Sequence, residues 1–492
     1  MKKAFSKYVR QALTNLFIPS RLRPSGRRTG RAGFILRSSS ATENGPRRAL
    51  LEARKKKALT GRGSGTAGVW PLYGAAFAMS ISLSVLWTAM PFIIRNIGGT
   101  EEHVGYIWAA NMLGYMLCLL LAAVMLGHLK PRQTTRTAVA AMFLATLVMF
   151  IVVYHVIDHN QLGKPMLIWM MIAAGTLAGA AMSLFWPFLM TWISADYEGA
   201  ILNRRLGTYN GMWSAAAIMG PLIGGMLVDV STLGPITVGV ACLAICFVLL
   251  CLAHDKSAGT AASARPASLW HGLPARENTA KMAVPPGSGR AGVSEICFDR
   301  GLLLRFRWMA RFALFCSWVC LGVSRSQFAL LFTGMGFSET QFGIIITIFG
   351  ICNFLVLTGA GRLAFWHFKP MLLLGVQIVL VLSLFLIIFG RTLWAFIPAF
   401  VIMGSGFGFA YSSHLYYGAC GSKKRSSQMA IHEITLSLGV IVGSGAGGYL
   451  SRHFGIYWPY WFAVVVLALG LAAQIVAWFV LRKESSVSPQ DT

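Results

Sequence analysis

The sequence predicts an all-α membrane protein with twelve transmembrane helices, arranged as two parallel six-helix halves. Of its 492 residues, 56% are hydrophobic and only 12% are charged, which is about half the charged fraction of soluble domains. The apolar residues occur in long runs, each close to the ~20 residues needed to cross the hydrocarbon core. A strand in lipid would leave backbone groups unpaired, so each run is expected to be a helix. These observations exclude a soluble enzyme and a disordered scaffold.

The expected helices follow one another along the chain, and short turns separate most of them. A stretch at 254–303, with scattered Pro, Gly, Ser and basic residues, is typical of a flexible linker. It divides an N-terminal half at 70–253 from a C-terminal half at 304–482, and a short tail at 483–492 follows. The predicted spans are 70–94, 103–127, 137–157, 166–192, 207–229, 232–253, 308–333, 341–361, 370–390, 392–417, 429–450 and 457–481.

The segment 1–69 is strongly basic. It holds 17 of the Lys and Arg residues and only Glu43 and Glu52 as acids. We expect a disordered cytoplasmic tail attracted to anionic lipid; an organelle transit peptide and an over-long predicted start are the alternatives. Its aromatic residues, Phe5, Tyr8, Phe17 and Phe34, are scattered and do not form a stacking platform, so a nucleic-acid partner is not expected.

Loop charge predicts the orientation. With the N-terminus in the cytoplasm, 38 Lys and Arg residues fall on the cytoplasmic side and 4 on the outer side. Cytoplasmic loops of membrane proteins carry this excess of basic residues. We therefore predict a multi-pass protein of a bacterial inner membrane, monomeric, with both termini in the cytoplasm.

Two motifs recur in the two halves. The stretch 98–105 (GGTEEHVG) matches 336–343 (GFSETQFG) at an offset of 238 residues, and 220–225 (GPLIGG) matches 443–448 (GSGAGG) at an offset of 223. Thr or Ser followed by Glu is typical of a helix N-cap with an acid in the first turn. Six helices in each half give both halves the same orientation, which disfavours a five-helix inverted repeat.

These motifs resemble the major facilitator superfamily over residues 70–482. The fifth predicted helix follows that family's antiporter motif, G-x8-G-x3-G-P-x2-G-G, with Ala216 in place of the second Gly. Glycines allow close helix approach and proline bends or weakens a helix, although small residues also pack in any helical bundle. The resemblance implies helix 8 as partner of helix 5 and helix 2 as partner of helix 11. The structural motif residues are Gly207, Gly220, Pro221, Gly224, Gly225, Gly443, Gly447 and Gly448.

Other family signatures are incomplete. The loop after helix 2 has Pro131 where the family has an acid, and the position of the family's proton-antiporter Arg on helix 4 is Met171. These departures argue against the standard proton-coupled drug antiporter and leave the fold unaffected.

Two charges inside predicted spans need a reason, because burying a charge in lipid is costly. Arg325 on helix 7 is either an anion-binding or gate residue or a side chain that snorkels to the outer interface. Glu433 on helix 11 is either a proton-coupling or gate carboxylate or an acid stabilised by the helix dipole. The matching position in the first half is Asn210, and His432 precedes Glu433.

The family resemblance also implies that helices 1, 4, 7 and 10 line a central cavity. The aromatic residues among the candidates could instead belong to the interfacial belt, and a packing role is the alternative for His414. No metal-ligand spacing and no C-x-x-C pair occurs among the nine cysteines, so neither metal nor cofactor is expected. The substrate-cavity candidates are Ser84, Trp87, Trp186, Arg325, Gln327, Tyr411 and His414.

The sequence therefore favours a secondary transporter that moves a small organic solute by alternating access, with export favoured by the fifth-helix motif. Protons or another ion are the candidate coupling partners. No P-loop occurs, which argues against an ATP-driven mechanism. The alternatives are an uptake transporter or symporter of the same fold and, from another class, a non-transporting membrane sensor or enzyme.

Overall fold

The computed structural model describes residues 69–125, 130–160, 163–194, 199–253, 300–363, 365–420, 422 and 425–486. Residues 1–68 of the predicted basic tail, nearly all of the predicted linker and the end of the C-terminal tail lie outside these residues. All twelve helices of the described part are long and apolar enough to cross a membrane, which confirms the predicted fold class.

The helices follow the predicted spans in order and extend past several of them. In the N-terminal half they are α3 (Trp70–Asn96), α4 (Glu101–Met125), α5 (Pro131–Asp158), α6 (Pro165–Ser194), α7 (Gly199–Val230) and α8 (Gly234–Leu252). In the C-terminal half they are α9 (Arg300–Gly334), α10 (Glu339–Arg362), α11 (Pro370–Phe389), α12 (Leu393–Ala419), α13 (Arg425–Phe454) and α14 (Trp458–Ser486).

Local sequence explains where several helices begin. Helices α5, α6 and α11 start at a proline, whose missing N–H costs nothing in the first turn. Helix α10 has a complete capping box, in which the Ser338 hydroxyl accepts a hydrogen bond from the backbone N–H of Gln341 and the Gln341 side-chain oxygen accepts one from the backbone N–H of Ser338. The N-cap predicted at this repeat is therefore present.

Arginines explain why some helices run beyond the hydrophobic spans. Arg136 on α5 donates to the carbonyl oxygens of Leu250 and Cys251 at the end of α8. Arg307 on α9 does the same for Tyr417 and Cys420 at the end of α12. Each guanidinium satisfies carbonyls that have no partner within their own helix, so the extra turns are fixed in place.

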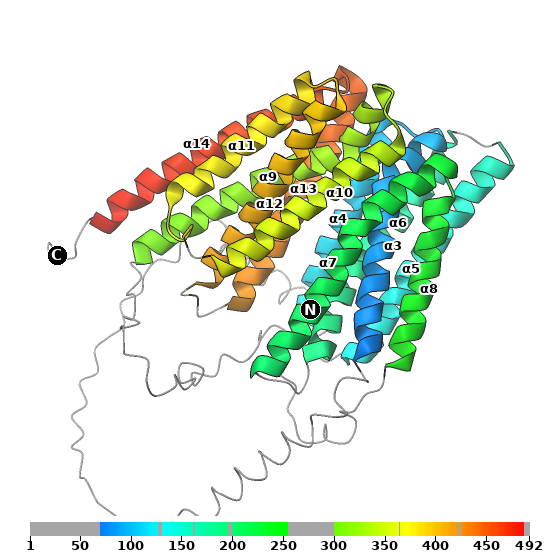
Figure 1. The fold of residues 1–492 in the computed structure, drawn as a ribbon, viewed down its shortest axis with the longest axis horizontal. Coiled ribbons are helices and arrows are strands. Elements are labelled where there is room, and N and C mark those ends of the chain that lie inside the picture. The colour runs from blue at the N-terminus through cyan, green and yellow to red at the C-terminus, as the bar shows by residue number, and fades with distance from the viewer. Residues whose placement is uncertain are drawn as a thin grey trace, which may run out of the picture. The chain divides into compact units, whose positions relative to one another are not determined.

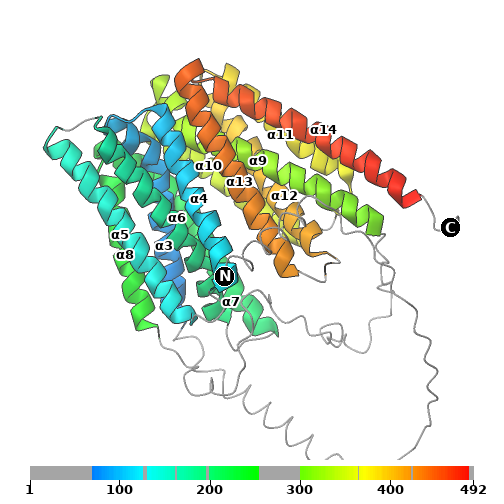
Figure 2. The same ribbon diagram turned by 180° about the vertical axis from the view of Figure 1, so that it is seen from behind.

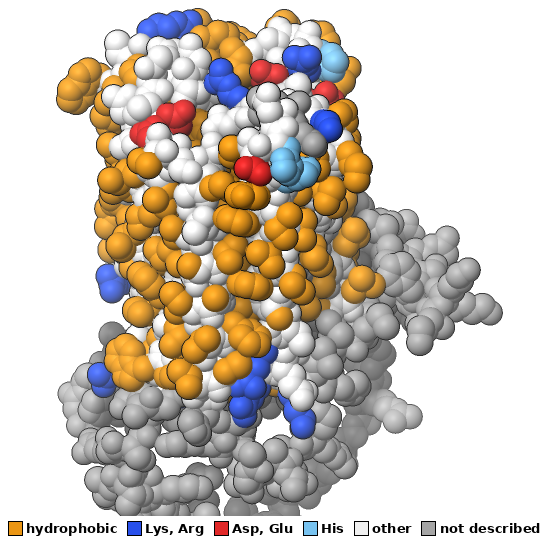
Figure 3. Space-filling model, turned by 90° about the vertical axis from the view of Figure 1, so that its right-hand side faces the viewer, with side chains coloured by type: hydrophobic (Ala, Val, Ile, Leu, Met, Phe, Trp, Pro, Cys, Tyr) orange, Lys and Arg blue, Asp and Glu red, His pale blue; other side chains and the backbone are white. Residues whose placement is uncertain are grey.

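We call the end with the turns 97–100, 231–233, 335–338 and 455–457 the predicted outer end, and the opposite end the predicted inner end. Helix α7 packs against α10 on one face (Figure 1), and α4 packs against α13 on the other (Figure 2). Apolar side chains cover the middle of the surface in Figure 3; acidic side chains gather toward the predicted outer end, and basic side chains lie toward both ends. This band is what a bilayer would cover.

Candidate transport pathway between the two halves

Glycines set the distance between the halves at both helix pairs. A Cβ added at Gly225 of α7 would lie 2.4 Å from the carbonyl oxygen of Glu339 and 3.1 Å from Cα of Gly343 in α10. A Cβ added at Gly448 of α13 would lie 2.9 Å from Cα of Gly105 in α4. Larger side chains would push these backbones apart. The repeated stretches of the sequence thus meet in space across the two halves: 220–225 contacts 336–343, and 443–448 contacts 98–105.

The remaining motif glycines pack within one half. A Cβ at Gly220 would lie 2.2 Å from Cβ of Ser84, and one at Gly224 would lie 2.7 Å from the carbonyl oxygen of Val85. Both contacts are with α3, and Pro221 lies in the same continuous helix α7. The implied partner, helix 8 of the prediction, is α10; it contacts Gly225 but not Gly220 or Gly224.

The fifth helix of the C-terminal half repeats this division. A Cβ at Gly443 would lie 2.1 Å from the carbonyl oxygen of Val319 on α9, and one at Gly447 would lie 3.5 Å from Cγ of Gln327. Of the three motif glycines on α13, Gly448 is the one that contacts α4, which is helix 2 of the prediction and the partner implied for the motif.

The α7–α10 helix pair opens toward the predicted inner end. A Cβ at Gly350 of α10 would lie 3.8 Å from Ile218 of α7, whereas nothing lies within 4 Å of one at Gly207, Gly211 or Gly361. The close contact therefore ends about halfway along α7. The halves are joined at the predicted outer end and separate toward the predicted inner end.

Polar contacts reinforce the joined end. Asp229, at the end of α7, accepts hydrogen bonds from the backbone N–H groups of Glu339 and Thr340 at the start of α10. On the other face, Arg452 of α13 lies 4.0 Å from the carboxylate of Glu101 at the start of α4. The carboxylate of Asp229 is favoured by the positive end of the α10 dipole, and the guanidinium of Arg452 is favoured by the opposite charge of Glu101.

Buried histidines form the core of a polar cluster in the C-terminal half. The Nδ1 atoms of His414 and His432 lie 2.8 Å apart, so one ring donates a hydrogen bond to the other. Both side chains are buried, and the Tyr411 ring packs edge-on against His432 at 4.6 Å. The Nε2 atom of His432 has no hydrogen-bond partner among the described residues. Three predicted candidates thus converge on one site.

The carboxylate of Glu433 extends this cluster to the other half. The hydroxyl of Tyr115 on α4 donates to Glu433 at 3.2 Å. This hydrogen bond joins α4 of one half to α13 of the other directly. Tyr115 escaped the sequence interpretation because a tyrosine within an apolar span looks like an ordinary packing residue.

Arg325 lies nearer the predicted outer end. Its guanidinium carbon lies 4.9 Å from the centre of the Phe349 ring, a cation–π contact between α9 and α10. No acidic side chain pairs with it among the described residues. Two positions along, the buried Gln327 donates at 3.3 Å to the carbonyl oxygen of Glu101 across the halves, and its Oε1 atom has no partner in the described part of the chain.

Helix register separates the two charges. The backbone of Ser444 on α13 faces Gly322 on α9. Counting back the same number of residues on both helices, Glu433 on α13 lies level with Arg311 on α9. Arg311 is fourteen residues, or about 21 Å, from Arg325 along α9. Aromatic rings link the two depths through contacts of 5.6 to 5.9 Å. They belong, in order, to Phe349, Phe407, Trp318 and Tyr411.

The other lining candidates do not join this cluster directly. Trp87 is buried, and the centre of its ring lies 5.1 Å from that of the Trp108 ring. The centre of the Trp186 ring lies 6.3 Å from that of the Tyr209 ring. Ser84 faces Gly220 at the α3–α7 contact. Asn210 is exposed and accepts a hydrogen bond from the indole of Trp213.

Together, these features define a helical membrane transporter built from two halves, with polar groups buried between them. The family model of the Major Facilitator Superfamily matches residues 72–419, and the chain belongs to that superfamily. It is thus a secondary membrane transporter of a small molecule, and not an enzyme, as the sequence predicted.

Solved transporters share this fold at low sequence identity. The chain is similar to a bacterial homologue of the iron transporter ferroportin in the inward-facing state, at TM-score 0.58 and 14% identity, covering 85% of this chain and 98% of that one. It is also similar to the nucleoside transporter NupG, at TM-score 0.61 and 12% identity, covering 86% and 100%. An auto-inhibited peptide transporter of the POT family matches at TM-score 0.61 and 10% identity, covering 86% and 98%.

One curated relative is a resistance protein. Multidrug resistance protein 2 of Bacillus subtilis (strain 168) is 30% identical over 158 residues. The match spans 31% of this chain and 38% of that protein.

Proposed function

We propose that this protein exports a small organic solute and that protonation of Glu433 couples export to a proton gradient. The observation that carries this proposal is the Tyr115–Glu433 hydrogen bond, which places a carboxylate between the two moving halves. A carboxylate is costly to bury when charged and much less so when protonated. Its protonation therefore favours the conformation that buries it most deeply.

Export is supported by the fifth-helix motif and by the relative named for multidrug resistance. Met171 stands where the family's proton antiporters carry an arginine, so coupling through Glu433 would use a different helix from the standard arrangement. Arg325, with no acidic partner among the described residues, favours a substrate that carries a negative group.

Orientation, lipid and assembly belong to the same proposal. The 38-to-4 distribution of Lys and Arg supports cytoplasmic termini in a bacterial inner membrane, with a monomeric transporter and anionic lipid beside residues 1–69. Single cysteines at Gly99, Lys164 or Arg391 should react with an impermeant reagent applied outside, and one at Ser288 should not. The reverse labelling would overturn this orientation.

Counterflow in proteoliposomes tests the transport proposal. Vesicles preloaded with each compound of a broad metabolite and drug panel should accumulate the labelled form of at least one compound, and the signal should require the protein. We expect organic anions and amphipathic compounds among the active members. If only inorganic ions exchanged, the proposed substrate class would be wrong.

A further inference from the structure

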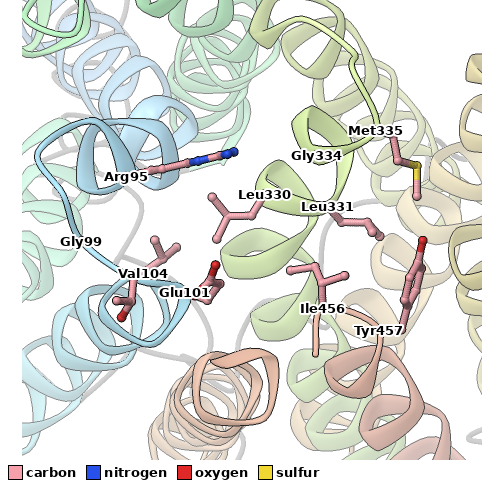
Figure 4. A pocket seen from close by; sticks show the side chains of 11 residues that line it. Arg95, Gly99, Glu101, Val104, Leu330, Leu331, Gly334, Met335, Ile456 and Tyr457 are labelled. Carbon is pink, nitrogen blue, oxygen red and sulfur yellow. The ribbon is translucent and has the colours of Figure 1, made fainter. Parts of the chain in front are cut away.

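A pocket opens between the halves at the predicted outer end, away from the histidine cluster. Its volume is about 300 Å³. Figure 4 shows the side chains of Arg95 and Glu101 pointing into it from the N-terminal half and facing Leu330, Leu331 and Tyr457 of the C-terminal half. Because both halves supply its walls, the pocket exists in this form only while the outer ends are together.

The equivalent place in the other repeat is filled by side chains, so the fold does not by itself require a pocket here. At the 238-residue offset, Gly99 and Val104 of the lining correspond to Phe337 and Phe342. The Phe342 ring packs against Phe92 at 5.2 Å, and the ring of Phe337 packs on Phe332 at 4.6 Å. Phenylalanines thus fill the equivalent space on the other side, whereas small side chains leave this one open.

The chemistry of the pocket favours an anion with an apolar body. The guanidinium of Arg95 donates to Thr333 at 3.3 Å, a contact that uses one of its five N–H donors. Glu101 already has Arg452 at 4.0 Å, and Arg391 lies 5.2 Å from the Tyr457 ring at the far wall. Glu339 also lies within electrostatic range of Arg95. Asp229 lies beside Glu339, so positive and negative charges around the pocket balance, and the attraction for a carboxylate comes from the remaining N–H donors of Arg95 at the pocket wall.

We propose that this pocket binds a small amphipathic organic anion, whose carboxylate pairs with Arg95 while its apolar body packs on Leu330, Leu331 and Tyr457. Arg95 forms paired hydrogen bonds to a carboxylate readily because its donors lie in a planar fork. An occupant contacts both halves, so it binds the joined outer end better than a separated one and shifts the population toward the closed outer end. The shift toward the closed outer end rests on the alternating access of the proposed function, whereas binding to the pocket does not.

Direct binding to the full chain in nanodiscs tests the site. The probe is phenylpropanoate, compared with phenylpropanol and phenylpropylamine, which share its apolar body but not its charge. We expect the acid to bind most tightly, and Arg95→Gln to weaken it by about tenfold or more. Lys164→Gln is the matched control, because it removes a basic residue at the same end that does not line the pocket; its affinity should equal that of the unchanged protein.

A second variant fills the space. Val104→Phe copies the residue of the other repeat and should abolish binding of all three probes. Equal affinity of phenylpropanoate for the unchanged protein and for Arg95→Gln, or tighter binding of the amine, would overturn the proposal even if Val104→Phe failed to fold.

Flux measurements separate this inference from the proposed function. Phenylpropanoate should inhibit counterflow in the unchanged protein and not in Arg95→Gln. Binding that depends on Arg95 without any inhibition would leave the site in place and contradict only the shift toward the closed outer end. Absence of counterflow for every compound would contradict the proposed function and leave the binding result untouched.

Discussion

The two helix pairs that join the halves are built alike and differ in charge. In the α7–α10 pair, Gly225 meets Gly343; in the α4–α13 pair, Gly448 meets Gly105. Toward the predicted inner end, the first pair has the exposed Asn210 at the position where the second has Glu433 bonded to Tyr115. The residue equivalent to Tyr115 at the 238-residue offset is Asn353.

The outer ends of the pairs differ in the same way. Asp229 caps the start of α10 through backbone N–H groups, whereas the equivalent Arg452 pairs with the acid Glu101. Steric contacts and the first-turn acid (Glu101 and Glu339) have thus been kept in both copies, whereas Tyr115, Glu433 and Arg452 have not. We infer that the glycines serve the movement that both pairs share, and that the charges of the α4–α13 pair serve its coupling.

The largest effect is expected from Gly225→Leu, which breaks the shared feature. Its Cβ would lie 2.4 Å from a backbone oxygen of α10, a clash that no side-chain rotation relieves. We expect the outer end to stay apart and transport to be lost, measured as labelling of outer cysteines and as counterflow. The control is Gly375→Leu on α11, a helix of neither pair, since nothing lies within 4 Å of an added Cβ there. Normal closure and transport in Gly225→Leu would show that close approach is not needed.

The second effect concerns the group found in only one pair. Glu433→Gln keeps the hydrogen bond from Tyr115 but cannot lose a proton, so flux driven by a pH gradient should disappear while solute exchange continues. Asn210→Ala, at the equivalent position, should retain both. The measurement is uptake into proteoliposomes with and without an imposed gradient. If flux through the Glu433→Gln variant still responded to the pH gradient, Glu433 would be an acid stabilised by the helix dipole and not a coupling group.

A smaller effect is expected at Arg325, where the comparison is between substrates. Replacing its charge-assisted contacts by those of a neutral amide costs about 1.5–3 kcal/mol when the substrate is an anion. Arg325→Gln should therefore weaken binding of an anionic substrate by about tenfold or more and leave a neutral one nearly unchanged. Equal losses for both substrates, in competition counterflow, would indicate a packing role instead.

The smallest effect is expected from Asp229→Asn. The side chain is solvent-accessible and an amide oxygen can still accept from the start of α10, so the loss is about 0.3–1 kcal/mol. The population with an open outer end should rise by no more than about fivefold, as read from cysteine labelling. A complete loss of closure would mean that this cap, and not the glycine contact, holds the α7–α10 pair together.

The sequence predicted the fold because its signals are local. Apolar runs of the right length, prolines at helix starts and the Ser338 capping box each specify a helix without reference to the rest of the chain. The extra turns of α5 and α9 were missed because they depend on Arg136 and Arg307 reaching the carbonyls of other helices.

Site geometry was harder to predict because it depends on which faces of distant helices meet. Glu433 and His432 stood out as polar residues in an apolar span, but their partners Tyr115 and His414 lie on different helices. The glycine motif predicted close packing, yet its division between α3 and α10 follows from the angle of each position around α7. Asn210 matched Glu433 by sequence offset, and nothing in the sequence indicated that it would be exposed.

The central claim is that protonation of Glu433 controls which end of the transporter is open, and a distance between the outer ends tests it most directly. Spin labels on cysteines at Lys164 and Arg391, one in each half, report that distance by pulsed electron resonance at several pH values. A charged Glu433 is least costly when the inner end is open to water, so lowering the pH should increase the population with a long outer distance. Glu433→Gln, which is neutral at every pH, should show that population throughout. A Glu433→Gln protein whose outer distances follow pH as the unchanged protein does would contradict the account.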